Sequence, residues 1–86
     1  MYKIQPTSRF NRLRKKLPQE IRKQLKDTLR RLQENPSHPS LRTKKYKSIP
    51  GVLESSINMQ YRILWEYNQK DKTIILLLAV GDHDIL

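Results

Sequence analysis

The segment Tyr61-Arg62-Ile63-Leu64-Trp65-Glu66-Tyr67, followed after a polar turn by Thr73-Ile74-Ile75-Leu76-Leu77-Leu78-Ala79-Val80, decides the fold predicted from this sequence. Residues 61–67 alternate between two faces, which is the period of a strand with one buried side. Residues 73–80 are almost entirely apolar, which predicts a central strand buried on both faces. The polar residues 68–72 between them indicate a turn.

A third strand, Leu53–Ile57, precedes this pair, and its register depends on the length of the next loop. A loop of residues 58–60 places the apolar residues of this strand opposite the apolar residues of 61–67. A two-residue loop would instead put Ile57 opposite Arg62 and so place apolar and polar residues on the same face. The favoured register pairs Ile57 with Tyr61 and Leu53 with Trp65. It also gathers Glu54, Ser56 and Arg62 on the other face, away from the helices.

The first half of the chain predicts a short strand and a pair of helices. Residues 2–5 form the strand, and Thr7 or Ser8 caps the first helix. The apolar residues of that helix are Phe10, Leu13 and Leu17, and those of the second, which starts around Pro18 and ends near Asn35-Pro36, are Ile21, Leu25, Leu29 and Leu32. With a weak basic strand at 44–48, the order indicates one α+β domain over residues 1–86, with helices on one face of a mostly antiparallel sheet.

The composition limits the function. The 86 residues carry 18 Lys and Arg against 8 Asp and Glu, a formal net charge of +10, which favours an anionic partner such as nucleic acid, a membrane surface or an acidic protein. A solvated basic surface without a specific ligand is the alternative.

There is no cysteine, which excludes disulfides and thiolate chemistry. The start shows no signal sequence, and the apolar run 74–80 is far shorter than the ~20 residues of a membrane span, so we expect a cytoplasmic protein without a membrane partner.

Arg62 and His83 are the strongest catalytic candidates. An arginine inside an apolar strand is costly unless it faces water or a partner, and its planar fork suits a phosphate; alternatively, it pairs with Glu54 or Glu66. His83 follows the last strand between two aspartates, where it could exchange protons near neutral pH; alternatively, it is simply an exposed histidine.

Two further features concern ligands. The basic segment, made of Arg42, Lys44, Lys45 and Lys47 with Tyr46 interleaved, fits backbone phosphates and a stacked base, or else protects a sheet edge with lysines. Gly51 and Gly81 are the only glycines, which excludes a phosphate-binding loop or dinucleotide fingerprint. The other histidine, His38, lies in a distant loop, so we expect neither a metal site nor a cofactor.

In the order and spacing of its motifs, the chain resembles the RelE/ParE superfamily of toxins from type II toxin–antitoxin systems over nearly its whole length. The motifs that carry the resemblance are Phe10–Leu17, Ile21-Arg22-Lys23, Leu32–Pro36, the basic segment, Pro50–Leu53, Tyr61–Trp65 and Val80–His83. The resemblance implies the RelE-like fold.

For the RelE-like branch, the resemblance implies an endoribonuclease that cuts mRNA in the ribosomal A site and needs no cofactor. Arg62 would stabilise the phosphorane, and His83 would act as acid or base. Glu54 is a further candidate base, and Lys44, Lys45 and Lys47 would dock on RNA. The expected partners are the ribosome, its mRNA and a cognate acidic antitoxin.

Two departures from the family pattern keep other functions open. Ser55 and Ser56 stand where many active members carry a second basic residue, and the chain ends in Asp84-Ile85-Leu86 where many carry an aromatic residue. One alternative is a ParE-like inhibitor of DNA gyrase, because fold does not settle function. Another is a catalytically weak protein of this fold that only binds its antitoxin.

Overall fold

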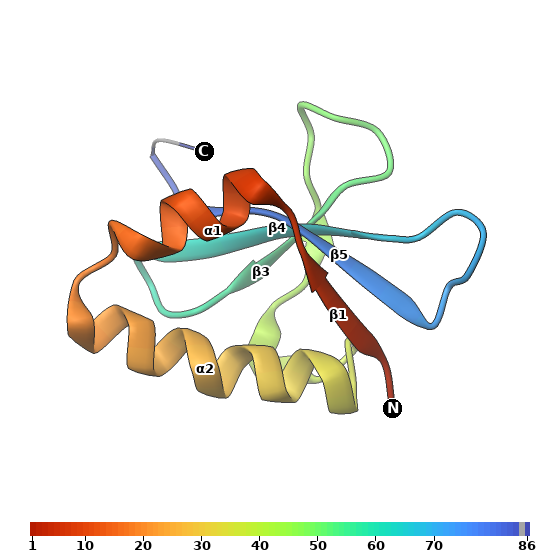
Figure 1. Ribbon diagram of the computed structural model, residues 1–86, viewed down its shortest axis with the longest axis horizontal. Helices are drawn as coiled ribbons and strands as arrows, with labels where there is room; N and C mark the ends of the chain where they lie inside the picture. The colour runs from red at the N-terminus through yellow and green to blue at the C-terminus, as the bar shows by residue number, and fades with distance from the viewer. Residues whose placement is uncertain (85) are drawn as a thin grey trace.

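A computed structural model describes residues 1–84 and 86 of the chain (Figure 1). Two helices lie on one face of a five-stranded mixed sheet, which confirms the predicted α+β class. The elements in chain order are β1 Lys3–Pro6, α1 Ser8–Lys15, α2 Gln19–Glu34, the 3₁₀ helix η1 Pro39–Leu41, β2 Lys44–Lys45, β3 Leu53–Ser56, β4 Tyr61–Tyr67 and β5 Ile74–Asp82.

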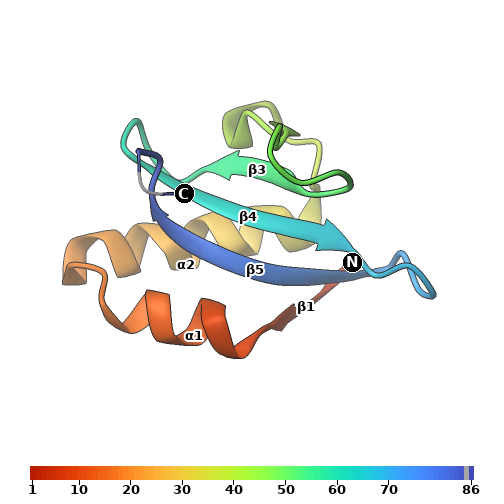
Figure 2. The same ribbon diagram turned by 90° about the horizontal axis from the view of Figure 1, so that it is seen from above.

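The sheet has the strand order β1-β5-β4-β3-β2. The strands β2 to β5 pair antiparallel, while β1 runs parallel to β5, its neighbour in the sheet but not in the chain. Figure 2 shows α1 and α2 on the same side of β3, β4 and β5. Within the described residues, no helix covers the other face of the sheet.

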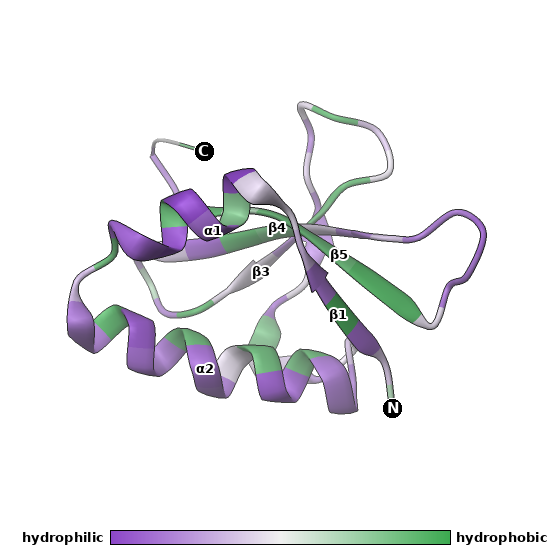
Figure 3. Ribbon diagram, in the orientation of Figure 1, coloured by the Kyte–Doolittle hydropathy of each residue, from purple (hydrophilic) through white to green (hydrophobic). Residues whose placement is uncertain are grey.

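The helices begin and end where the sequence pattern indicates. Thr7 caps α1, because its hydroxyl accepts a hydrogen bond from the Phe10 N–H at 3.2 Å. Pro18 is the residue before α2 and not part of its first turn, and Asn35 follows its end. The outward faces of both helices are hydrophilic (Figure 3). In the described part of the chain, no helix is long and apolar enough to cross a membrane.

The main core lies between the helices and the sheet and centres on Trp65, which is fully buried. Its indole N–H donates to the Ser55 hydroxyl at 2.8 Å, and that hydroxyl lies 2.7 Å from the Thr43 hydroxyl. Tyr67 packs edge-on against the indole, with ring centroids 5.1 Å apart. This polar chain satisfies the indole N–H without water and ties the start of the basic segment to the core.

The strand β5 differs from the prediction. It is an interior strand, but β4 is the middle one, and β5 is not buried on both faces. Ile75 and Leu77 are buried under the helices, whereas Ile74, Leu76 and Leu78 are only half-buried on the uncovered face. The pairing also shifts after Leu64, where the β5 partner changes from Ala79 to Leu77 and leaves Leu78 as an extra residue. Such a bulge turns Val80 toward the helices and Ala79 away from them.

The pairing of β3 with β4 follows the predicted register. Leu53 lies opposite Trp65 and Ser56 opposite Arg62, and the Ile57 N–H donates to the Tyr61 carbonyl at 2.9 Å. The regular strand β3 ends at Ser56, one residue earlier than predicted. The basic strand is shorter still: only Lys44 and Lys45 pair with β3, because the chain then turns away through residues 48–51.

Candidate functional site

Arg62 lies near the start of β4, on the sheet face without helices, beside Glu54 of β3. The Arg62 Nε atom is 3.7 Å from a Glu54 carboxylate oxygen, and their side chains are only 18% and 16% exposed. The Nη1 group donates to the backbone carbonyls of Asn58 and, at 3.2 Å, of Tyr61. One edge of the guanidinium is therefore fixed by the backbone, and Glu54 partly neutralises it. The ion pair considered from the sequence is present.

His83 lies just beyond β5 and is about half exposed. Its backbone N–H donates to the Gln60 carbonyl at 2.9 Å, and its ring Nδ1 is 3.3 Å from the same oxygen. Its Nε2 is 3.2 Å from an Asp84 carboxylate oxygen, and Asp82 lies on the Nδ1 side at 3.9 Å. The imidazole thus has carboxylates on both sides and remains open to solvent.

One loop, residues 58–60 between β3 and β4, holds both catalytic candidates. The carbonyl of Asn58 anchors Arg62, and the carbonyl of Gln60 anchors His83. Arg62 lies opposite Gly81, two residues before His83, so the backbones of the two candidates lie at the same corner of the sheet. The part played by Asn58 and Gln60 was not predicted from the sequence. An asparagine in a hairpin loop is the signal that could have found it, because its side chain accepts backbone N–H groups further along the chain.

The basic segment lies beside this corner. Lys44 is paired with Glu54, and directly opposed residues of an antiparallel pair point to the same face, which is the face of Arg62. Tyr46 is half-buried against the small cluster of Val52, Leu64 and Ala79. A cavity of about 640 Å³ opens beside it, lined by Lys45, Tyr46, Lys47, Pro50, Gly51, Val52 and Leu53.

Among the described residues, one group of side chains has the composition of a metal site: Asp82, His83 and Asp84 each bring a ligand atom within 4.8 Å of the others. These atoms also interact with protein groups. The Asp82 carboxylate accepts hydrogen bonds from the Asp84 N–H at 2.9 Å and the Gln60 amide at 2.7 Å. The expectation of no metal site therefore stays a prediction.

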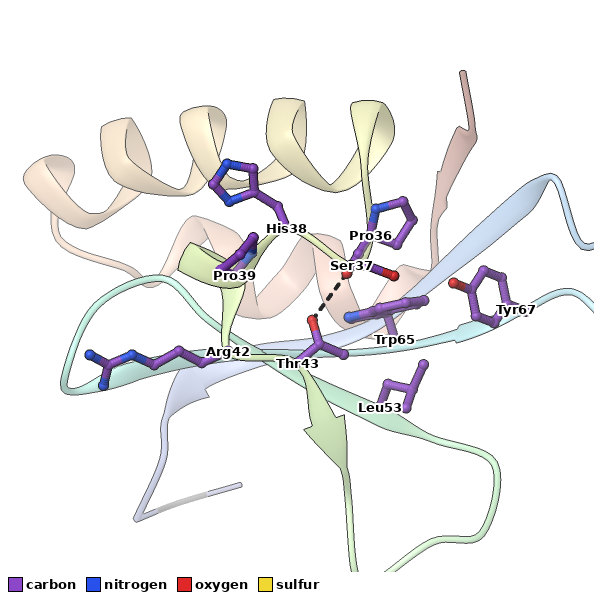
Figure 4. Close-up of a pocket in the computed structure, with 9 residues that line it drawn as sticks. All are labelled: Pro36, Ser37, His38, Pro39, Arg42, Thr43, Leu53, Trp65 and Tyr67. Atoms are coloured by element: carbon purple, nitrogen blue, oxygen red, sulfur yellow. Dashed lines mark hydrogen bonds between the residues drawn. The ribbon is translucent and has the colours of Figure 1, made fainter.

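A second cavity lies on the helix side of the sheet (Figure 4). It measures about 390 Å³ and is lined by residues 36–39 and by Arg42, Thr43, Leu53, Trp65 and Tyr67. Arg42 has a left-handed backbone, with φ at 48°. Because the sheet separates this cavity from Arg62, it is not part of the candidate site.

The two hydrogen bonds to Asp82 lead to a prediction about stability and pH. The bond from the Asp84 N–H, and then that from Gln60, lower the pKa of Asp82 below its usual value of 3.8. A carboxyl group with a lowered pKa stabilises the fold above its unfolded pKa and loses that contribution as the pH falls through the folded pKa. We expect wild type to be more stable than Asp82→Asn in urea titrations at pH 7, and the difference to shrink below about pH 3.8. A difference that stayed constant down to pH 2 would contradict this assignment.

Comparisons with known proteins identify the class. Residues 4–86 match the family described as the ParE toxin of type II toxin–antitoxin system, parDE. The chain therefore belongs to this family, and it is a toxin of a type II toxin–antitoxin system within the RelE/ParE superfamily. No curated protein sequence shows significant similarity to it.

Solved structures agree on the RelE-like fold. The chain is similar to one in the intact E. coli RelBE toxin–antitoxin complex, with a TM-score of 0.73, 22% identity and coverage of 95% of this chain and 96% of that one. It matches one in the RelBE2 complex of Mycobacterium tuberculosis, with a TM-score of 0.76, 20% identity and coverage of 94% and 96%. It is also similar to YafQ from E. coli strain BL21(DE3), with a TM-score of 0.77, 13% identity and coverage of 99% of this chain and 97% of that one. At these identities the likeness shows the fold alone.

Proposed function

We propose that this toxin is a ribosome-dependent mRNA endoribonuclease. The observation that carries the proposal is the anchoring of Arg62 and His83 by carbonyls of one loop, with Arg62 on the sheet face that also presents Lys44 and Glu54. A fixed cation and an open imidazole at one corner fit a reaction that develops negative charge at a phosphate and moves protons.

The proposed reaction is an internal transesterification of the RNA. The 2′-oxygen forms a bond to the adjacent phosphorus while the bond to the 5′-oxygen breaks, giving a cyclic phosphate and a free 5′-hydroxyl. Glu54 takes the proton of the 2′-hydroxyl, and His83 gives a proton to the departing 5′-oxygen. Arg62 stabilises the charge on the phosphorane oxygens, and its interaction with Glu54 gives way as the phosphate enters.

The surface charge supports an anionic substrate. Among the described Lys and Arg residues, only Arg30 and Arg62 lie within 4.0 Å of a carboxylate. The remaining described cations, including exposed Lys44, Lys45 and Lys47, form no ion pair within that distance. In this proposal these three lysines bind backbone phosphates of the mRNA, and Tyr46 contacts a base beside them.

The cellular partners follow from the family and the charge. The RelBE structures are toxin–antitoxin complexes. We assign this chain an acidic antitoxin as well, which covers the basic surface and prevents access to Arg62. The ribosome supplies the mRNA, and the site of action is the cytoplasm.

Mapping of mRNA 5′ ends after induced expression tests the proposal. We expect new 5′ ends within translated codons, because the substrate is presented in the ribosome. A matched transcript without its start codon serves as the control and should stay intact. Equal cutting of both transcripts would exclude ribosome dependence, and the absence of new ends in cells with soluble toxin would exclude the nuclease.

Inhibition of DNA gyrase is the second candidate, because the matching family is described by its ParE member. Gyrase inhibition by a bound toxin needs no proton transfer, so His83 would be dispensable. A plasmid supercoiling assay beside a translation assay separates the two functions. Inhibited supercoiling with intact protein synthesis would replace the nuclease by the gyrase inhibitor.

A toxin fold that only binds its antitoxin is the third candidate. Ser55, one of the two residues at the position where active relatives carry a cation, is fully buried and bonded to Trp65. It contributes nothing to the site face, and only Ser56 lies opposite Arg62. Normal growth of cells that contain soluble toxin would support this function.

A further inference from the structure

Asn58 is the most connected residue of the loop that carries the site. Its side-chain oxygen accepts the backbone N–H groups of Gln60 and Tyr61, each at 2.9 Å. Its own carbonyl accepts a hydrogen bond from the Arg62 Nη1. The side chain therefore fixes the shape of the loop, and the main chain uses that shape to hold the guanidinium.

The amide of Asn58 also reaches the helix layer. Its Nδ2 donates to the Oε1 atom of Gln24, in α2, at 2.6 Å. Gln24 makes no other side-chain hydrogen bond among the described residues, and it touches neither Arg62 nor His83 through such a bond. A continuous path of hydrogen bonds thus runs from α2, through Asn58, to Arg62 on the opposite face of the sheet.

We propose that Asn58 is a positioning residue for Arg62 and that Gln24 holds Asn58 in place from α2. This inference rests on the proposed function, in which Arg62 binds the scissile phosphate. Asn58 itself does not contact the reacting atoms. With its amide held by Gln24, its carbonyl keeps one edge of the guanidinium engaged, so that the rest of the fork meets the phosphate in a fixed orientation without prior rearrangement.

Gln24→Ala is the sharpest test, because it removes the acceptor for Asn58 and leaves every residue of the site unchanged. Alanine is also the most favourable helix residue, so the variant should fold. Gln24→Glu keeps an acceptor oxygen and should behave as wild type. Gln33→Ala is the matched control: it also removes one hydrogen bond of an α2 glutamine, to the Tyr2 carbonyl at 3.2 Å, but away from the loop.

Two readouts apply to each variant. We expect Gln24→Ala to lower the rate constant for mRNA cleavage on ribosomes about tenfold with little change in the apparent KM, because positioning acts on the reacting geometry. The second readout is the ¹⁵N–¹H NMR signal of the Arg62 Nε–H in the free toxin. It should shift, and exchange faster with solvent, in Gln24→Ala but not in Gln24→Glu or Gln33→Ala.

The combination of readouts separates the two proposals. If the Arg62 signal and the cleavage rate are both unchanged in Gln24→Ala, the positioning role is wrong. A shifted signal with an unchanged cleavage rate also overturns it, because the path then has no effect on the reaction. If the signal shifts but wild type cleaves no RNA, the path from α2 to Arg62 stands and the proposed nuclease function fails.

Discussion

Arg62→Ala is expected to lower mRNA cleavage by at least about 100-fold, which is the loss typical of removing one preorganised donor to a developing oxyanion. The guanidinium lies in a largely buried position beside Glu54, where its charge is less screened than on an open surface. Growth arrest on induction should disappear with the cleavage. The measurement is the single-turnover rate on ribosome-bound mRNA, compared with wild type.

The stability of this variant needs its own measurement, because Arg62 has a structural role as well. It donates hydrogen bonds to the carbonyls of Asn58 and Tyr61, and their loss should cost about 1 kcal/mol of unfolding free energy. Urea unfolding followed by circular dichroism will show whether Arg62→Ala is folded under assay conditions.

Arg62→Lys is the matched variant, since it keeps the charge and loses the planar fork. We expect its cleavage rate to lie between those of wild type and Arg62→Ala. A folded Arg62→Ala protein that cleaves at the wild-type rate would remove Arg62 from the mechanism and, with it, the proposed reaction.

The parts of the fold that alternate or repeat regularly were predictable from the sequence. The alternation in residues 61–67 gave the bounds of β4, and matching apolar faces across a three-residue loop gave the Leu53–Trp65 pairing. That register alone placed Glu54 and Arg62 on the same face. In the structure, a Glu54 carboxylate oxygen lies 3.7 Å from the Arg62 Nε atom. Local periodicity is sufficient here because the strands are adjacent in the chain.

Other features depended on contacts that periodicity does not encode. The run of apolar residues 74–80 predicted burial on both sides, but Leu76 and Leu78 are only half-buried because the helices cover one face of the sheet alone. The bulge in β5 arises from its pairing with β4, which the apolar run does not encode either. The strand β2 is short because the chain leaves the sheet after Lys45. The anchoring of Arg62 and His83 depends on two loop carbonyls. Asn58 in the hairpin loop was a signal for the shape of the loop, but every residue has a carbonyl, so the sequence did not indicate which carbonyls would hold the two side chains.

Trp65→Ala is expected to have the largest effect on stability, about 3–5 kcal/mol of unfolding free energy. Trp65 is fully buried, and its indole N–H starts the hydrogen-bond chain that runs through Ser55 to Thr43, the residue before Lys44. A small domain has only about 5–15 kcal/mol in total, so a large fraction of this protein's stability would be lost. Because Trp65 is the only tryptophan, urea unfolding is followed by circular dichroism.

Two milder variants separate packing from hydrogen bonding at this position. Trp65→Phe keeps most of the buried ring, and Ser55 keeps Thr43 as its partner, so we expect a cost of about 1–2 kcal/mol. Ser55→Ala leaves the indole N–H buried without an acceptor and should cost about 1–3 kcal/mol. Since Thr43 then keeps only its longer hydrogen bond to the Pro36 carbonyl, at 3.3 Å, Ser55→Ala should also weaken RNA binding by the neighbouring lysines more than Trp65→Phe does. Equal RNA affinity in the two variants would show that the basic segment is held in place without this chain of hydroxyl groups.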